Sequence, residues 1–181
     1  MNPGGPLRKE HRLIEKMISI IGNETIHIKR NNSVNPVFID TAVDFMKIYA
    51  DRTHHGKEEH ILFETLTDMD LSTEDRSLMK ELIADHVRFR NMTDNLVSLK
   101  NVFIKGRKEN LSEIVETMDM LVRHYPEHVR KEEERFFPAS LGYLSEEKQK
   151  LILAQFWDYD KNMIHIKYTQ VVTKLLETSQ R

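Results

Sequence analysis

Cysteine is absent from the 181 residues, which excludes disulfide bonds, a thiolate nucleophile, cysteine-held iron–sulfur clusters and thiolate zinc sites. Glycine and proline are scarce, with six and five residues, and they lie where helices are expected to begin or end. The formal net charge of −2 gives no electrostatic basis for binding nucleic acid or an anionic membrane. No apolar run resembles a signal peptide or approaches membrane-spanning length, so a cytoplasmic location is expected.

The length and composition are typical of one soluble helical domain. Hydrophobic residues make up 39% and charged residues 31% of the chain, and a chain of this length can bury a core. No stretch shows the period-two alternation of a half-buried strand. The sequence therefore predicts an all-α protein whose single domain covers residues 1–181.

Apolar residues recur at three- and four-residue spacing along five segments, as in amphipathic helices. The clearest segment runs from residue 7 to about 30, where the inward face carries Leu7, His11, Ile14, Ile18, Ile21, Thr25 and Ile28. Further helices are expected at about 36–66, 72–105 and 110–137, followed by a break at 138–142 and a fifth helix at about 145–177. These lengths predict an up-down-up-down four-helix bundle over about 7–138, with the fifth helix packed outside it.

Residues that favour helix ends support these boundaries. Asn35 followed by Pro36 predicts a helix that begins with proline at its first position. Ser72 and Asp75 form an acidic variant of the capping box. Pro126 lies inside the fourth helix, which we expect it to kink. In the second helix, the expected apolar side carries Phe38, Ala42, Phe45, Ile48 and Tyr49.

One ten-residue pattern occurs twice. It reads H-H-G-K-E-E-H-I-L-F from His54 to Phe63 and H-V-R-K-E-E-E-R-F-F from His128 to Phe137. Each copy has a histidine four residues before a glutamate, a spacing that puts both side chains on one helix face, one turn apart. An imidazole nitrogen and a carboxylate oxygen can then reach the same small volume inside a bundle.

The four bundle helices each supply polar donors to a common interior. Six such groups without partners would each cost about 1–3 kcal/mol. Their sum would rival the whole stability of a domain, roughly 5–15 kcal/mol. A pair of metal ions would compensate for this cost, and imidazole and carboxylate without thiolate suit iron, manganese or zinc. The predicted metal ligands are His11, His54, Glu58, His86, His128 and Glu132.

The set H…HxxKEE…LF…H…HxxKEE…FFP, spread over four helices, resembles the hemerythrin-like family over residues 7–138. The resemblance implies a non-haem di-iron centre, with terminal ligands at the four predicted histidines and bridging carboxylates at Glu58 and Glu132. The implied cofactor is two iron ions with an oxo or hydroxo bridge, for which manganese or zinc can substitute. The family includes oxygen carriers and sensors, iron-responsive modules, and proteins that repair iron–sulfur clusters after nitric oxide stress.

Two departures from the oxygen carriers shape the functional expectation. Oxygen-carrying hemerythrins have a second histidine one turn after the third-helix ligand, where this chain has Arg90, and their last bridging residue is an aspartate five positions after its histidine. This chain is more similar to the branch with four histidines and two glutamates, although that branch's cluster-repair proteins carry an additional cysteine-containing N-terminal segment. We therefore expect binding or sensing of O2, NO or redox state. The alternative is oxidase, peroxidase or NO reductase activity, or iron donation in cluster repair.

The sequence leaves the roles of some polar residues undecided. The apolar phase of the second helix, read from Phe45, Ile48, Leu62 and Leu66, points His55 and Glu59 inward, whereas the alignment of the two copies favours His54 and Glu58. His55 remains a candidate additional ligand. His124 is interpreted as a surface residue or a partner of the ligands, and Arg90 and Tyr125 as candidate hydrogen-bond donors to the site. The fifth helix is a candidate surface for a homodimer or a protein partner.

Overall fold

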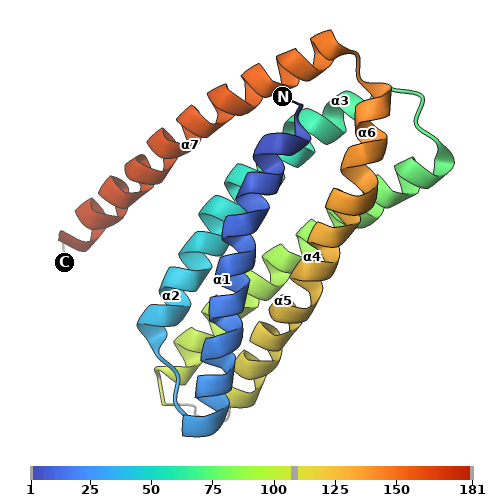
Figure 1. The fold of residues 1–181 in the computed structure, drawn as a ribbon. Helices are drawn as coiled ribbons and strands as arrows, with labels where there is room; N and C mark the ends of the chain where they lie inside the picture. Colours follow the sequence, from blue (N-terminus) through green and yellow to red (C-terminus); the bar gives the residue numbers. More distant parts are fainter. Residues whose placement is uncertain (1, 107–109, 180–181) are drawn as a thin grey trace.

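Four helical columns run side by side along one axis, and a final helix crosses obliquely near the end of the bundle where the N-terminus lies (Figure 1). The computed structural model describes residues 2–106 and 110–179, without the side chains of 164–166 and 168–179. The columns are α1 (Gly4–Asn31); α2 (Pro36–Phe45) continued by the π-helical segments η1 (Met46–His55) and η2 (Glu58–Phe63) and by α3 (Glu64–Thr67); α4 (Thr73–Phe103); and α5 (Leu111–Lys131) continued by η4 (Glu132–Phe136) and α6 (Phe137–Tyr143). The last helix is α7 (Glu146–Ser179).

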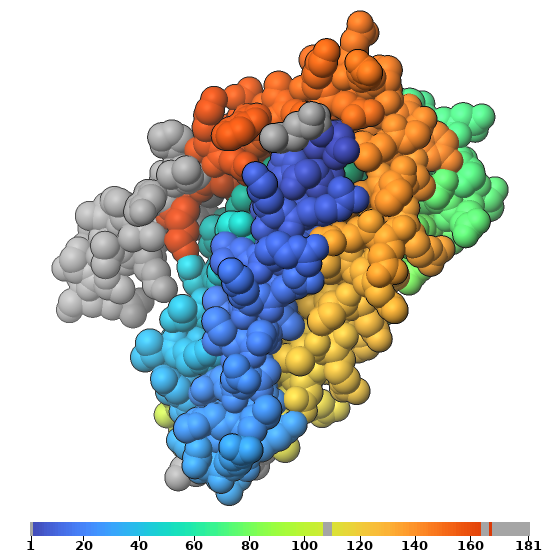
Figure 2. Space-filling view, in the orientation of Figure 1, coloured from blue at the N-terminus to red at the C-terminus, as the bar shows by residue number. Residues whose placement is uncertain are grey.

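The predicted all-α bundle with an additional C-terminal helix is confirmed, since the described residues contain no strand. Among those residues, no helix has both the length and the apolar content needed to cross a membrane. Figure 2 shows α1 lying between the second column and the α5–α6 column. The described part of α7 lies across the end of the molecule where the N-terminus is. All seven residues predicted for the inward face of α1 are buried.

Side-chain caps begin two of the columns as predicted. The Asn35 side-chain oxygen accepts hydrogen bonds from the backbone N–H groups of Val37 and Phe38, at 3.1 and 3.3 Å, and Pro36 follows it. The Ser72 hydroxyl oxygen accepts one from the N–H of Asp75, at 3.0 Å. Both bonds satisfy backbone donors that a helix leaves free in its first turn.

The inward face predicted for the second column is partly wrong. Ala42 is buried, but Phe38, Phe45 and Tyr49 lie at the edge of the core, which is formed instead by Ile39, Val43, Met46 and Ala50. In α2 the buried face lies beside the predicted one; beyond Phe45 a π-helical turn takes about one residue more than an α-helical turn, so the inward phase shifts again along η1 and η2. A regular 3.6-residue repeat therefore does not describe this helix.

The break expected at 138–142 is also wrong, because the fourth column continues through α6 to Tyr143. Pro138 lies at the start of α6, directly after the π-helical segment η4. α5 is likewise continuous through Pro126.

Two clusters of buried apolar residues fill the bundle, and the candidate donors lie between them. On α1, His11 is flanked by Leu7 of one cluster and Ile14 of the other. On α4, His86 is flanked in the same way by Leu82 and Phe89. Bulk water is thereby kept from the polar layer on both sides.

Close packing of α7 on Gly56 gives a stability prediction. A Cβ atom at Gly56 would lie 2.2 Å from the Tyr159 hydroxyl oxygen, whereas one at Gly142 meets nothing within 4 Å. We expect Gly56→Ala to lower the free energy of unfolding by about 1–3 kcal/mol, although alanine favours a helix over glycine. Gly142→Ala is the control and should change it little, as measured by urea unfolding. In a Tyr159→Ala background the cost of Gly56→Ala should disappear; a cost that persists there would contradict the packing argument.

Candidate metal centre

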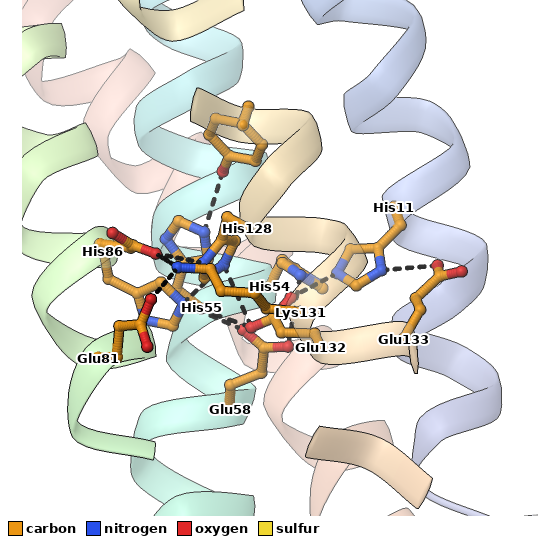
Figure 3. A network of polar contacts seen from close by, with 12 residues as sticks. His11, His54, His55, Glu58, Glu81, His86, His128, Lys131, Glu132 and Glu133 are labelled. Carbon is orange, nitrogen blue, oxygen red and sulfur yellow. Dashed lines mark hydrogen bonds and ion pairs between the residues drawn. The ribbon is translucent and has the colours of Figure 1, made fainter. Parts of the chain in front are cut away.

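Five imidazoles and two carboxylates point toward one another in the interior of the bundle (Figure 3). They come from all four columns, and none is more than 1% exposed. The residues are His11 on α1, His54 and His55 on η1, Glu58 on η2, His86 on α4, His128 on α5 and Glu132 on η4. The structure thus brings together all six residues predicted as ligands and adds His55.

The donors form two groups that share both glutamates. One donor atom each from His11, His54, Glu58 and Glu132 lie within 4.8 Å of one another, as do donor atoms from Glu58, His86, His128 and Glu132. A third group joins His55 to His86 and His128. Two cations could therefore sit side by side with Glu58 and Glu132 in common.

For the second helix, the apolar phase predicted His55 and Glu59 inside, and the motif alignment predicted His54 and Glu58. The π-helical turns explain why each prediction is partly right. His54 and His55 are both buried because η1 widens the inward arc that a helix presents to the core. Glu58 faces the centre, whereas Glu59 lies beside it and accepts a hydrogen bond from the Nδ1 atom of His86. The alignment of the two motif copies predicted the inward glutamate correctly.

A second ring of carboxylates orients the histidines. An ionised carboxylate only accepts hydrogen bonds, so the Nδ1 atom that faces it must carry a proton, and in a neutral imidazole Nε2 is then left with a lone pair. Three imidazoles have such a partner: His11 with Glu133 at 2.9 Å, His54 with Glu10 at 2.9 Å, and His86 with Glu59 at 2.7 Å. The Nδ1 atom of His128 lies 3.5 Å from Asp85.

These lone pairs face carboxylate oxygens. The Nε2 atom of His11 lies 3.1 Å from Glu132, and that of His54 lies 3.5 Å from Glu58. All four carboxylate oxygens of Glu58 and Glu132 are buried, and the groups that face them in the described structure are these imidazoles, including the Nε2 atom of His128 at 3.1 Å from Glu132. Lone pair against lone pair in a dry interior is unfavourable unless a cation lies between them. The residues present therefore fit metal ions.

In the protein without metal, protons supply part of the positive charge that these buried donors require. Burial lowers the pKa of His128, but the carboxylates of Glu132 and Asp85 outweigh it and raise that pKa to about 9. Burial, reinforced by the negative charge of Glu132, raises the pKa of Glu58 well above its ordinary value. For Glu132 the nearby His128 and the other imidazoles outweigh burial, and its pKa is well below the ordinary value. A metal ion bound at His128 would have to displace this proton.

The second glutamate and the last phenylalanine of the motif have the same role in both copies. Glu59 supports the histidine of α4 and Glu133 that of α1, so each copy orients a histidine of another helix. The motif phenylalanines stack on those same rings at 11° between planes, Phe63 on His86 at 6.1 Å and Phe137 on His11 at 5.8 Å. This pseudo-symmetry accounts for the second glutamate after the lysine and for the last phenylalanine of the pattern, whose roles the sequence did not indicate.

The motif lysines hold the remaining outer carboxylates. Lys57 donates to Glu10, the partner of His54, and Lys131 donates to Asp85, which lies beside His128. Glu10 and Asp85 were not predicted from the sequence. The two lysines, which stand three residues after a histidine in both copies, indicated a shared role but not which acids they contact.

One difference between the copies bears directly on the site, because the buried His55 of the first copy corresponds to the buried Val129 of the second. His55 stacks on His86 with ring centroids 3.9 Å apart, and its Nε2 atom lies 2.9 Å from the Tyr125 hydroxyl oxygen. Tyr125 thus contacts the site as predicted. Arg90 instead pairs with Asp51 and Glu59.

Residues 5–140 match the family described as the hemerythrin HHE cation-binding domain. The chain belongs to this family. Comparison with curated proteins and with solved structures gives no match. Membership implies metal binding, typically of iron, and the groups of histidine and glutamate donors are compatible with it. α7 lies beyond the matched residues.

The unequal environments of the two central glutamates give a prediction for the metal-free protein. Glu58→Met removes buried oxygens without partners, so the free energy of unfolding at pH 7 should rise by about 1–3 kcal/mol. Glu132→Met removes the charge that holds the His128 proton, so it should lower that free energy by on the order of 2–3 kcal/mol. Urea unfolding in the presence of a chelator measures both, with the exposed Glu64→Gln as control. Equal effects of the two substitutions would contradict the assigned charges.

Proposed function

We propose that this protein holds two iron ions with an oxo or hydroxo bridge and binds or senses O2, NO or redox state there. His11 and His54 hold one ion, His86 and His128 hold the other, and Glu58 and Glu132 bridge them. His55 is an additional ligand on the His86 side. Such an iron pair supplies reversible binding of small ligands and a change between ferrous and ferric states.

The observation that carries this proposal is the pair of donor groups sharing two glutamates, with buried nitrogen and oxygen lone pairs directed at one another. A structural core would satisfy such groups with hydrogen bonds. Imidazole outnumbers carboxylate here, and no thiolate is available. A site of this composition favours ligand binding and redox switching. Oxygenation is instead carried out by sites that are richer in carboxylate.

A cavity of about 200 Å³ supports access by a small ligand. It is lined by the exposed Arg52 and Asp94 and by the buried rings of His55, Phe89 and Tyr125, so it leads from the surface toward the donors. Its volume is several times the roughly 30 Å³ that one water molecule occupies in the liquid, enough for a diatomic molecule.

The buried tyrosine favours a second candidate function, oxidase, peroxidase or NO reductase activity. Tyr125 is buried and lines this cavity, and its hydroxyl lies next to His55, where it can donate a hydrogen bond to a reacting molecule. Turnover of peroxide or nitric oxide by the iron-loaded protein, lost in Tyr125→Phe, would favour this candidate over simple binding. Iron donation in cluster repair is a further alternative that the same iron-loaded protein would test.

Iron loading tests the main proposal. After anaerobic loading with ferrous ion, we expect two irons per chain and a visible spectrum that changes on exposure to air or nitric oxide. His54→Ala and Glu132→Ala should each lose iron and the stabilisation that iron confers. His60→Ala, which changes an exposed histidine of the same motif copy, is the matched control. A colourless parent protein that retains no iron would refute the proposal.

The pH dependence of metal affinity provides an independent check. Because the pKa of His128 is raised to about 9, metal competes with a proton below that pH. Affinity for zinc, a redox-silent probe, should therefore rise about tenfold per pH unit for each proton displaced between pH 6 and 8, and level off near pH 9. Asp85→Asn removes one carboxylate beside His128, so the plateau should begin at lower pH. Titration calorimetry measures both; a flat profile would contradict displacement of this proton.

A further inference from the structure

The C-terminal helix contributes a charged group to the chain of contacts that supports His54. The Lys57 ammonium, none of whose side chain is exposed, donates to Glu10 of α1 and to Asp160 of α7, the latter at 2.7 Å. The other oxygen of Glu10 lies 2.9 Å from the Nδ1 atom of His54. A continuous path of ionic contacts therefore joins α7 to a predicted metal ligand, although α7 lies outside the matched family region.

The second motif copy offers an internal comparison. Lys131 also pairs with two acids, Glu81 and Asp85, but both belong to α4 inside the bundle. The Lys131 side chain is 21% exposed, whereas that of Lys57 is 0% exposed. Water can therefore replace a missing acid at Lys131, but a missing acid at Lys57 leaves a buried ammonium with one partner.

Other contacts hold α7 on the segment between His54 and Glu58. The Tyr159 ring packs on Gly56, and its hydroxyl donates to the backbone carbonyl of Arg52 at 3.0 Å. Phe156 is buried, and its ring centroid lies 5.7 Å from the Lys57 nitrogen. In the second copy the position of Gly56 is occupied by the exposed Arg130. The first copy alone is thus shaped to receive a helix.

We propose that α7 is part of the metal centre, with Asp160 a positioning residue that acts on His54 through Lys57 and Glu10. This inference rests on the proposed metal pair. Asp160 shares the charge of Lys57, which leaves Glu10 free to hold the His54 ring with Nε2 directed at the ion. By linkage, metal bound at His11 and His54 strengthens the docking of α7, and undocking of α7 weakens that ion selectively.

Release of iron to a ferrous-specific chelator tests the role of Asp160. Outer-sphere partners of metal-bound histidines are typically worth about 10–100-fold in metal affinity. Asp160→Asn should therefore release one of the two irons at least about tenfold faster than the parent protein and leave the second unchanged. Asp160→Glu, which restores the charge, should recover most of the retention.

Two matched variants serve as comparisons. Glu81→Gln removes the corresponding acid from Lys131 and should have a smaller effect, because Lys131 keeps Asp85 and reaches water. Asp158→Asn, on the exposed side of α7 and 3.4 Å from Lys161, should match the parent protein. Equal release rates in Asp160→Asn and Asp158→Asn would overturn the inference, as would faster release of both irons together, which indicates general loosening of the fold.

The parent protein separates failure of this inference from failure of the proposed function. If it loads two irons and Asp160→Asn behaves like Asp158→Asn, α7 has no part in the centre while the metal pair stands. If it loads none, the proposed function and this inference fall together. Amide hydrogen exchange supplies a second readout: loading should slow exchange in the segment around Asp160, and an unchanged rate would count against the linkage.

Discussion

The structure depends on how the charges of the buried carboxylates and imidazoles at its centre are balanced. Two carboxylates with partnerless oxygens and imidazoles with inward lone pairs occupy a layer from which apolar clusters exclude water on both sides. Such groups repel one another in a medium of low dielectric constant unless positive charge lies among them. Without metal, the proton on His128 supplies part of that charge; two metal ions would supply all of it. The fold holds the donors in place before any ion binds, which lowers the cost of binding.

The outer layer explains how that arrangement persists. Each motif copy supplies an inward histidine and glutamate, a lysine that fixes an outer acid, and a second glutamate and a phenylalanine that orient a histidine on another helix. Because the supports cross between columns, the position of a donor depends on helices other than its own. The same contacts thus pack the helices together and orient the candidate ligands.

The two halves of the site are similar but not equivalent. The half with His86 and His128 gains His55, Tyr125 and the cavity, whereas the half with His11 and His54 gains the contact with α7. A small ligand approaching through the cavity would meet the first half, and a change at the second would reach the C-terminal helix.

The sequence by itself determined the all-α bundle, the inward face of α1 and the inward position of the six residues predicted as ligands, because helical periodicity and the spacing of four in each motif copy are local properties. It did not determine the face of the second column, since the π-helical turns of η1 and η2 shift the phase and bring both His54 and His55 inside. It also missed the continuation through Pro138 and the outer acids Glu10 and Asp85. Only the tertiary structure decides these, because each acid lies on a different helix from the lysine that holds it, and a π-turn is retained by packing rather than by local preference.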